Sequence, residues 1–66
     1  MASGTRGKLK EELEGVHRNC EWIKVHCSKC LVLLEPQYES LITGFESLVK
    51  VADTLDEFAQ DMYSKV

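Results

Sequence analysis

Apolar residues recur along the first half of the chain with the spacing of a helix that packs against another helix. Intervals of three and four residues alternate through Leu9, Leu13, Val16, Cys20, Ile23, Cys27, Cys30 and Leu34. The second half repeats the pattern through Tyr38, Leu41, Phe45, Leu48, Ala52, Leu55, Ala59, Met62 and Val66. Such intervals fill heptad positions a and d, which is typical of helices crossing at a shallow angle. The sequence therefore predicts an all-α fold.

A single proline separates the two patterns. Pro36 has no amide hydrogen and disfavours helical geometry at Glu35, so the first helix should end there. We expect one domain, 1–66, with a helix over about 6–34, a turn at 35–36 and a second helix over about 37–65. Two helices of equal length with a short connector predict an antiparallel hairpin.

Folding at Pro36 should stack the two patterns into a seam, with Cys27 opposite Phe45 and Cys20 opposite Ala52. Helix 2 also carries apolar residues on both flanks of this seam, and two helices cannot cover so wide a face. We therefore predict a homodimeric four-helix bundle, with a heteromeric helical assembly as the alternative. The predicted oligomer interface comprises Ile42, Val49 and Tyr63 on one flank, with Val51 and Phe58 on the other.

Composition supports a small soluble protein that needs a partner. The chain has 66 residues, of which 44% are hydrophobic and 29% charged. A chain of this size buries only about 60% of its unfolded surface, so it usually requires a metal, a staple or a second chain. Residues 1–34 carry six Lys/Arg against four Glu, whereas residues 35–66 carry two Lys against seven Asp/Glu. This asymmetry is too weak for a dedicated nucleic-acid binder.

The sequence favours a cytoplasmic protein without membrane contact. The opening stretch "MASGTRGKLK" lacks the apolar core of a secretion signal, and no apolar run approaches about 18 residues. In the cytoplasm thiols stay reduced, and an odd count of three cysteines fits free thiols.

The cysteines and histidines gather in "HRNCEWIKVHCSKC", which raises the alternative of a metal-binding bundle using Cys27 and Cys30 with Cys20 and His17. On a straight helix the Cα atoms of Cys20 and Cys27 lie about 10.5 Å apart. Sulfurs around one zinc ion must lie within about 4 Å of each other, so one helix cannot supply all four ligands. We favour cysteine as a small apolar seam residue, and we predict no cofactor.

No catalytic arrangement is predicted. The Cys–His pairs lie on one helix, and no long loop could build a pocket that excludes water. The glycines form no phosphate-binding loop. Enzyme activity is therefore not expected.

The outer surface of helix 1 is the predicted partner-binding site. It combines cations with apolar groups, and tryptophan and arginine are favoured in protein interfaces. The same stripe could instead be a second contact surface of the bundle, or stack on unpaired bases with Arg18 and Lys29 on phosphates. Its residues are Arg18, Trp22, Val25, Lys29 and Val32.

In length, equal helices and short turn, the chain is similar to the plasmid-encoded Rop proteins, hairpin dimers that bind RNA loop pairs. The similarity is architectural and assigns no role to any residue. We expect a non-catalytic protein-interaction module: a small scaffold, regulator or assembly subunit. The metal-binding bundle and a Rop-like RNA regulator using Arg18, Trp22 and Lys29 are the alternatives.

Overall fold

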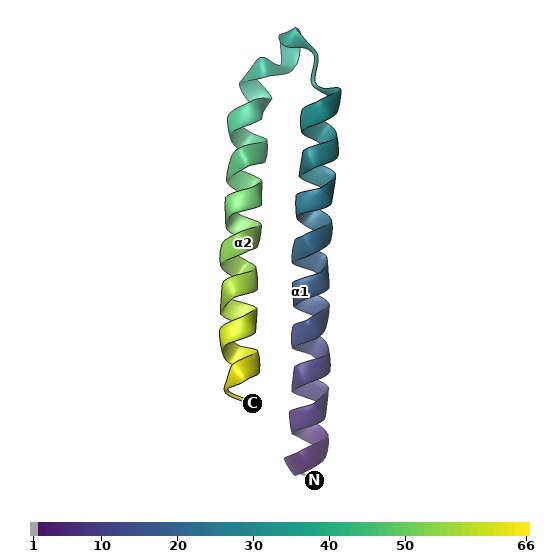
Figure 1. Ribbon diagram of the computed structural model, residues 1–66, viewed down its shortest axis with the longest axis vertical. Helices are drawn as coiled ribbons and strands as arrows, with labels where there is room; N and C mark the ends of the chain where they lie inside the picture. The colour runs from purple at the N-terminus through teal and green to yellow at the C-terminus, as the bar shows by residue number, and fades with distance from the viewer. Residues whose placement is uncertain (1) are drawn as a thin grey trace.

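Two long helices run antiparallel and pack side by side (Figure 1). The computed structural model describes residues 2–66, with side chains from Gly4 onward. Helix α1 spans Ala2–Leu33, the 3-10 helix η1 spans Pro36–Leu41, and helix α2 spans Ile42–Ser64. The predicted all-α antiparallel hairpin is confirmed.

The connector between the two α-helices covers 34–41 rather than the predicted 35–36, and most of it is a 3-10 helix. Glu35 is extended (φ −89°, ψ 163°), as expected before a proline. The Tyr38 amide donates to the Glu35 carbonyl at 2.8 Å, which closes the first turn. We expected an α-helix from about residue 37, whereas 36–41 is 3-10 and the α-helix begins at Ile42. The Glu35 side chain supplies no cap, and short i→i+3 bonds commonly tighten such helix starts.

Helix α1 begins earlier than expected, at Ala2 rather than near Arg6. Gly4 and Gly7 each cost about 1 kcal/mol relative to alanine, yet neither ends the helix, since only proline interrupts it outright. The first residues of α1 consequently project past the end of α2 (Figure 1). We call this end of the molecule, opposite the connector, the free end.

The hairpin is a rod with unusually large surface for its mass. Its Cα atoms extend over 56 × 15 × 10 Å with a radius of gyration of 15.8 Å, against about 11 Å for a compact domain of this length. The accessible surface is 5267 Å², whereas a compact monomer of this mass exposes about 4,200 Å². About 1,000 Å² of surface is thus exposed that a compact fold would cover.

Candidate functional site

One heptad position of each helix lies directly between α1 and α2, and we call these residues the inner row. Among residues 4–66, the buried apolar side chains all belong to it: Cys20, Cys27, Ala52 and Ala59. Leu13, Leu34, Phe45 and Val66 occupy the same heptad position and are half-buried, whereas Tyr38 in the connector is exposed. Small side chains allow the two helices to approach closely. They also bury little apolar surface, so the inner row supplies only a modest part of the free energy of folding.

The second heptad position, which we call the outer row, remains exposed. Each of its side chains is between 39% and 50% exposed, although the sequence pattern placed them in the seam. A helix with one neighbour can direct only one heptad position straight at it, which explains the difference. The outer row comprises Leu9, Val16, Ile23, Leu41, Leu48, Leu55 and Met62. Cys30 occupies the same heptad position of α1 but is half-buried, so it is not counted in this exposed row.

The outer rows of both helices lie on the same side of the hairpin. The opposite flanks are joined by polar contacts, because His17 pairs with Asp56 and the Tyr63 hydroxyl donates to Glu14 at 3.1 Å. We call the side of the hairpin that carries these contacts the polar side. The outer rows of α1 and α2 both lie on the opposite side. They form a continuous apolar face. Near the connector this face is hollowed into an open apolar groove lined by Leu41, Gly44, Phe45 and Leu48.

The five residues predicted for the oligomer interface are divided between the two sides. Val51 and Phe58 lie next to the outer row of α2 and are exposed, so they widen the apolar face. Tyr63 lies on the polar side, where the Lys10 ammonium stands 5.2 Å from its ring centroid. Ile42 and Val49 precede Tyr63 at heptad intervals and share its flank.

The polar side contains a hydrogen-bonded cluster that sequence reasoning missed. His17 Nδ1 lies 2.6 Å from Asp56 Oδ1, and Gln60 Nε2 donates to Asp56 Oδ2 at 3.1 Å. Asp56 is only 7% exposed. The hydrogen bond from His17 is the main cause that lowers the pKa of the Asp56 carboxyl below its usual value. In the sequence of α2, Asp56 is the one charged residue at the heptad position that Ile42, Val49 and Tyr63 also occupy. A carboxylate among apolar residues at this position is the sequence feature that could have indicated a buried polar contact.

Lys24 provides a second link between the helices. Its ammonium donates to Asp53 Oδ1 at 2.9 Å and lies 3.0 Å from Glu21 Oε1, one turn earlier on α1. These hydrogen bonds raise the pKa of Lys24 above its usual value. Asp53 of α2 thus contacts α1 through Lys24. Exposed ion pairs of this kind contribute little stability, so this link adds little to the free energy of folding.

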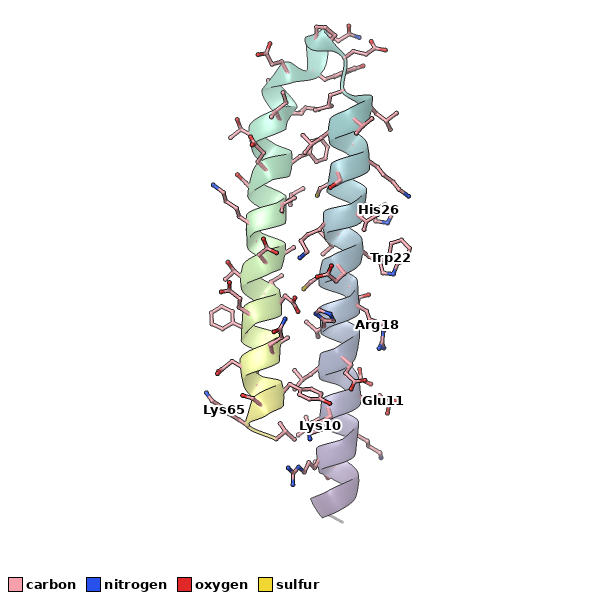
Figure 2. The ribbon with its side chains drawn as sticks, viewed as in Figure 1. Lys10, Glu11, Arg18, Trp22, His26 and Lys65 are labelled. Carbon is pink, nitrogen blue, oxygen red and sulfur yellow. The ribbon has the colours of Figure 1, made fainter. Side chains whose placement is uncertain are left out.

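The predicted partner-binding stripe lies on the outside of α1. Figure 2 shows Arg18, Trp22 and His26 pointing away from α2. Trp22 is 58% exposed, and its ring lies 5.8 Å from that of His26 at an interplanar angle of 31°. The other members of the stripe are also exposed: Val25, Lys29 and Val32. Arg18, Trp22 and Val25 line a shallow groove with His17 and Glu21.

The cysteines are free thiols, with Cys20 and Cys27 buried and Cys30 half-buried. Within the part of the chain that the structure describes, three side chains that can ligate a metal lie together: His17, Glu21 and Asp56. Their donor atoms are all within 4.8 Å of one another. His17 thus has metal-ligating neighbours, but Cys27 and Cys30 do not join that group. The hairpin alone does not assemble the cysteine site considered from the sequence.

Cys20 should react with alkylating reagents only when the hairpin opens. Burial raises the pKa of the Cys20 thiol, and the nearby Asp56 carboxylate raises it further, so little thiolate is present. In the folded protein at pH 8 we expect iodoacetamide to modify Cys20 about tenfold more slowly, or slower still, than in urea. Trypsin cuts after Arg18, Lys24 and Lys29 and places each cysteine in its own peptide for mass spectrometry. Equal rates in both solvents would contradict the buried position.

Residues 2–66 include no helix with both the length and the apolar character to cross a membrane. No family model matches the chain, and neither a curated protein nor a solved structure matches it. Three surfaces of the antiparallel hairpin can therefore bear on its function: the apolar face, the polar side and the exposed tryptophan stripe.

Proposed function

We propose that the chain is a non-catalytic interaction module that dimerises through its apolar face into a four-helix bundle. The observation that carries the proposal is the direction of the two heptad rows. In a four-helix bundle each helix directs positions a and d together toward the bundle centre. In the hairpin the inner rows face each other and the outer rows lie beside them on the apolar face, so a second copy placed on that face completes the centre.

The distribution of side-chain sizes supports this arrangement. The inner row buries cysteine and alanine, whereas the outer row carries leucine, isoleucine, valine and methionine. Full burial of such a side chain contributes about 1.5–3 kcal/mol, and half of that gain is still unrealised in the single hairpin. A large part of the available hydrophobic stabilisation thus depends on covering the apolar face.

The dimensions of the apolar face suit a second copy. From Leu41, at the end of η1, to Met62 in α2 it runs for about 32 Å, and two helices side by side are about 20 Å wide. The excess surface of about 1,000 Å² is close to the 800 Å² or so that each partner buries in a standard interface. A two-fold axis would let the same face serve both subunits.

Dimerisation leaves the outer surface of α1 available. We assign the stripe of Arg18, Trp22 and Lys29 to a protein partner, since an exposed tryptophan between two cations has the composition of an interface hot spot. The biochemical role is that of a scaffold, regulator or assembly subunit that displays this stripe twice.

The oligomeric state tests the proposal directly. Light scattering after size-exclusion chromatography should give twice the chain mass of 7.5 kDa. Folding coupled to association also makes the melting temperature rise with protein concentration, which circular dichroism can follow over a hundredfold range. A monomer that melts cooperatively at one temperature over that range would overturn the homodimer.

A further inference from the structure

The polar side brings together three metal-ligating side chains from two helices. His17 and Glu21 are one turn apart on α1, and Asp56 projects from α2. One donor atom from each lies within 4.8 Å of the other two, and the closest pair, His17 Nδ1 and Asp56 Oδ1, is 2.6 Å apart. Residues four apart share a helix face, so His17 and Glu21 are fixed as neighbours by local geometry.

We propose that His17, Glu21 and Asp56 bind one divalent transition-metal ion, with Zn²⁺ the best match. One imidazole nitrogen and two carboxylate oxygens form a ligand set that zinc accepts at about 2.0–2.2 Å, with water in the fourth position. Donor atoms of such a tetrahedron are about 3.4 Å apart. The His17–Asp56 contact therefore opens slightly and Glu21 moves inward, which its exposed side chain can do.

Hydrogen bonds already orient the Asp56 carboxylate toward the proposed metal position. Gln60 donates to one of its oxygens and leaves the other directed at His17. Ordered second-sphere hydrogen bonds of this type orient metal ligands and increase affinity. Aspartate is ionised at neutral pH, as a metal-ligating carboxylate must be. Lys24 would release Glu21 to the metal and keep its contact with Asp53.

Solvent can reach the His17, Glu21 and Asp56 cluster, and none of these residues belongs to the apolar face. The His17 side chain is 47% exposed, so an ion can enter without unfolding the hairpin. The cluster lies on the side opposite the apolar face, so dimerisation would leave it open. A bound ion would tie α1 to α2 near mid-length, which is how small domains with thin cores often gain stability.

Zinc titration monitored by NMR of the histidine rings tests the proposal, because the chain has two histidines and both are on α1. The ring nitrogens of His17 should shift at one equivalent of Zn²⁺, and those of His26 should not. In competition with a chromophoric chelator, Glu21→Gln and His17→Gln should each lower zinc affinity about tenfold or more, since even second-sphere changes reach that size.

Two matched variants serve as controls: Glu12→Gln removes another exposed glutamate of α1, and His26→Gln removes the other histidine. Both should bind zinc like the wild type. Glu21 is exposed, so its variant should retain the helical circular-dichroism signal even if His17→Gln does not. Wild-type affinity in Glu21→Gln, equal shifts of both histidines, or a thiolate-to-metal absorption band with Co²⁺ would overturn the site. Light scattering reports dimerisation separately, so either proposal can fail alone.

Discussion

Replacing Leu55 by aspartate should abolish the dimer and most of the helical signal at micromolar concentration. Leu55 lies in the middle of the apolar face and is 48% exposed in the single hairpin. In the proposed dimer two-fold symmetry brings two copies of the new carboxylate into one apolar core. Burying an unpaired charge costs several kcal/mol, which is comparable with the whole stability of a small domain. Light scattering and circular dichroism at the same concentrations measure both losses.

The neighbouring residue provides the control for this experiment. Thr54 lies on the outer side of α2, where its hydroxyl donates to the Lys50 carbonyl. Thr54→Asp adds the same charge one position away, and aspartate and threonine have similar helix propensities. This variant should dimerise and melt like the wild type. A Leu55→Asp protein that stays folded and dimeric would show that the apolar face does not form the interface.

Ala52→Leu should destabilise the protein by about 1–3 kcal/mol, because an enlarged side chain in a close-packed seam forces its surroundings apart. Ala52 is 1% exposed and lies in the inner row, where the helices approach most closely. Leucine is nearly as good a helix former as alanine, so propensity cannot account for such a loss. Urea unfolding followed by circular dichroism measures it.

Lys50→Leu is the matched control for Ala52→Leu. It places leucine on the exposed side of the same helix, two residues earlier, where no helix packs. Its unfolding midpoint should stay close to that of the wild type. If Ala52→Leu were as stable as Lys50→Leu, the close approach of α1 and α2 at this point would be wrong.

Much of the fold follows from the spacing of apolar residues. Unbroken a/d patterns on both sides of Pro36 are sufficient to predict two helices and their antiparallel pairing. The tryptophan stripe lies outside because Trp22 falls away from the a and d positions. The pattern cannot tell which of the two positions faces the partner helix, since that depends on how far each helix turns about its axis. For this reason Leu48 and Leu55 were expected in the seam and lie on the open face.

The histidine–carboxylate cluster needed three-dimensional information. His17 and Asp56 are 39 residues apart, and their contact depends on both the register of the helices and the flank that each residue occupies. A count of charges groups Asp56 with the other acidic residues of the second half and does not single it out. Local pairs such as Lys24 with Glu21 follow from i,i+3 spacing alone, whereas pairs across the hairpin do not.

The free end of the hairpin gives the molecule a direction along its length. That end carries Arg6, Lys8 and Lys10, whereas the connector carries Glu35 and Glu39. If two hairpins aligned their connectors at the same end, like charges would meet at both ends of the bundle. With the connectors at opposite ends, each cationic end lies beside an acidic connector. Charge complementarity selects orientation more effectively than it adds affinity, so this polarity favours a bundle with its connectors at opposite ends. In that two-fold arrangement helix α1 lies beside its copy, and the two tryptophan stripes face the same side of the bundle.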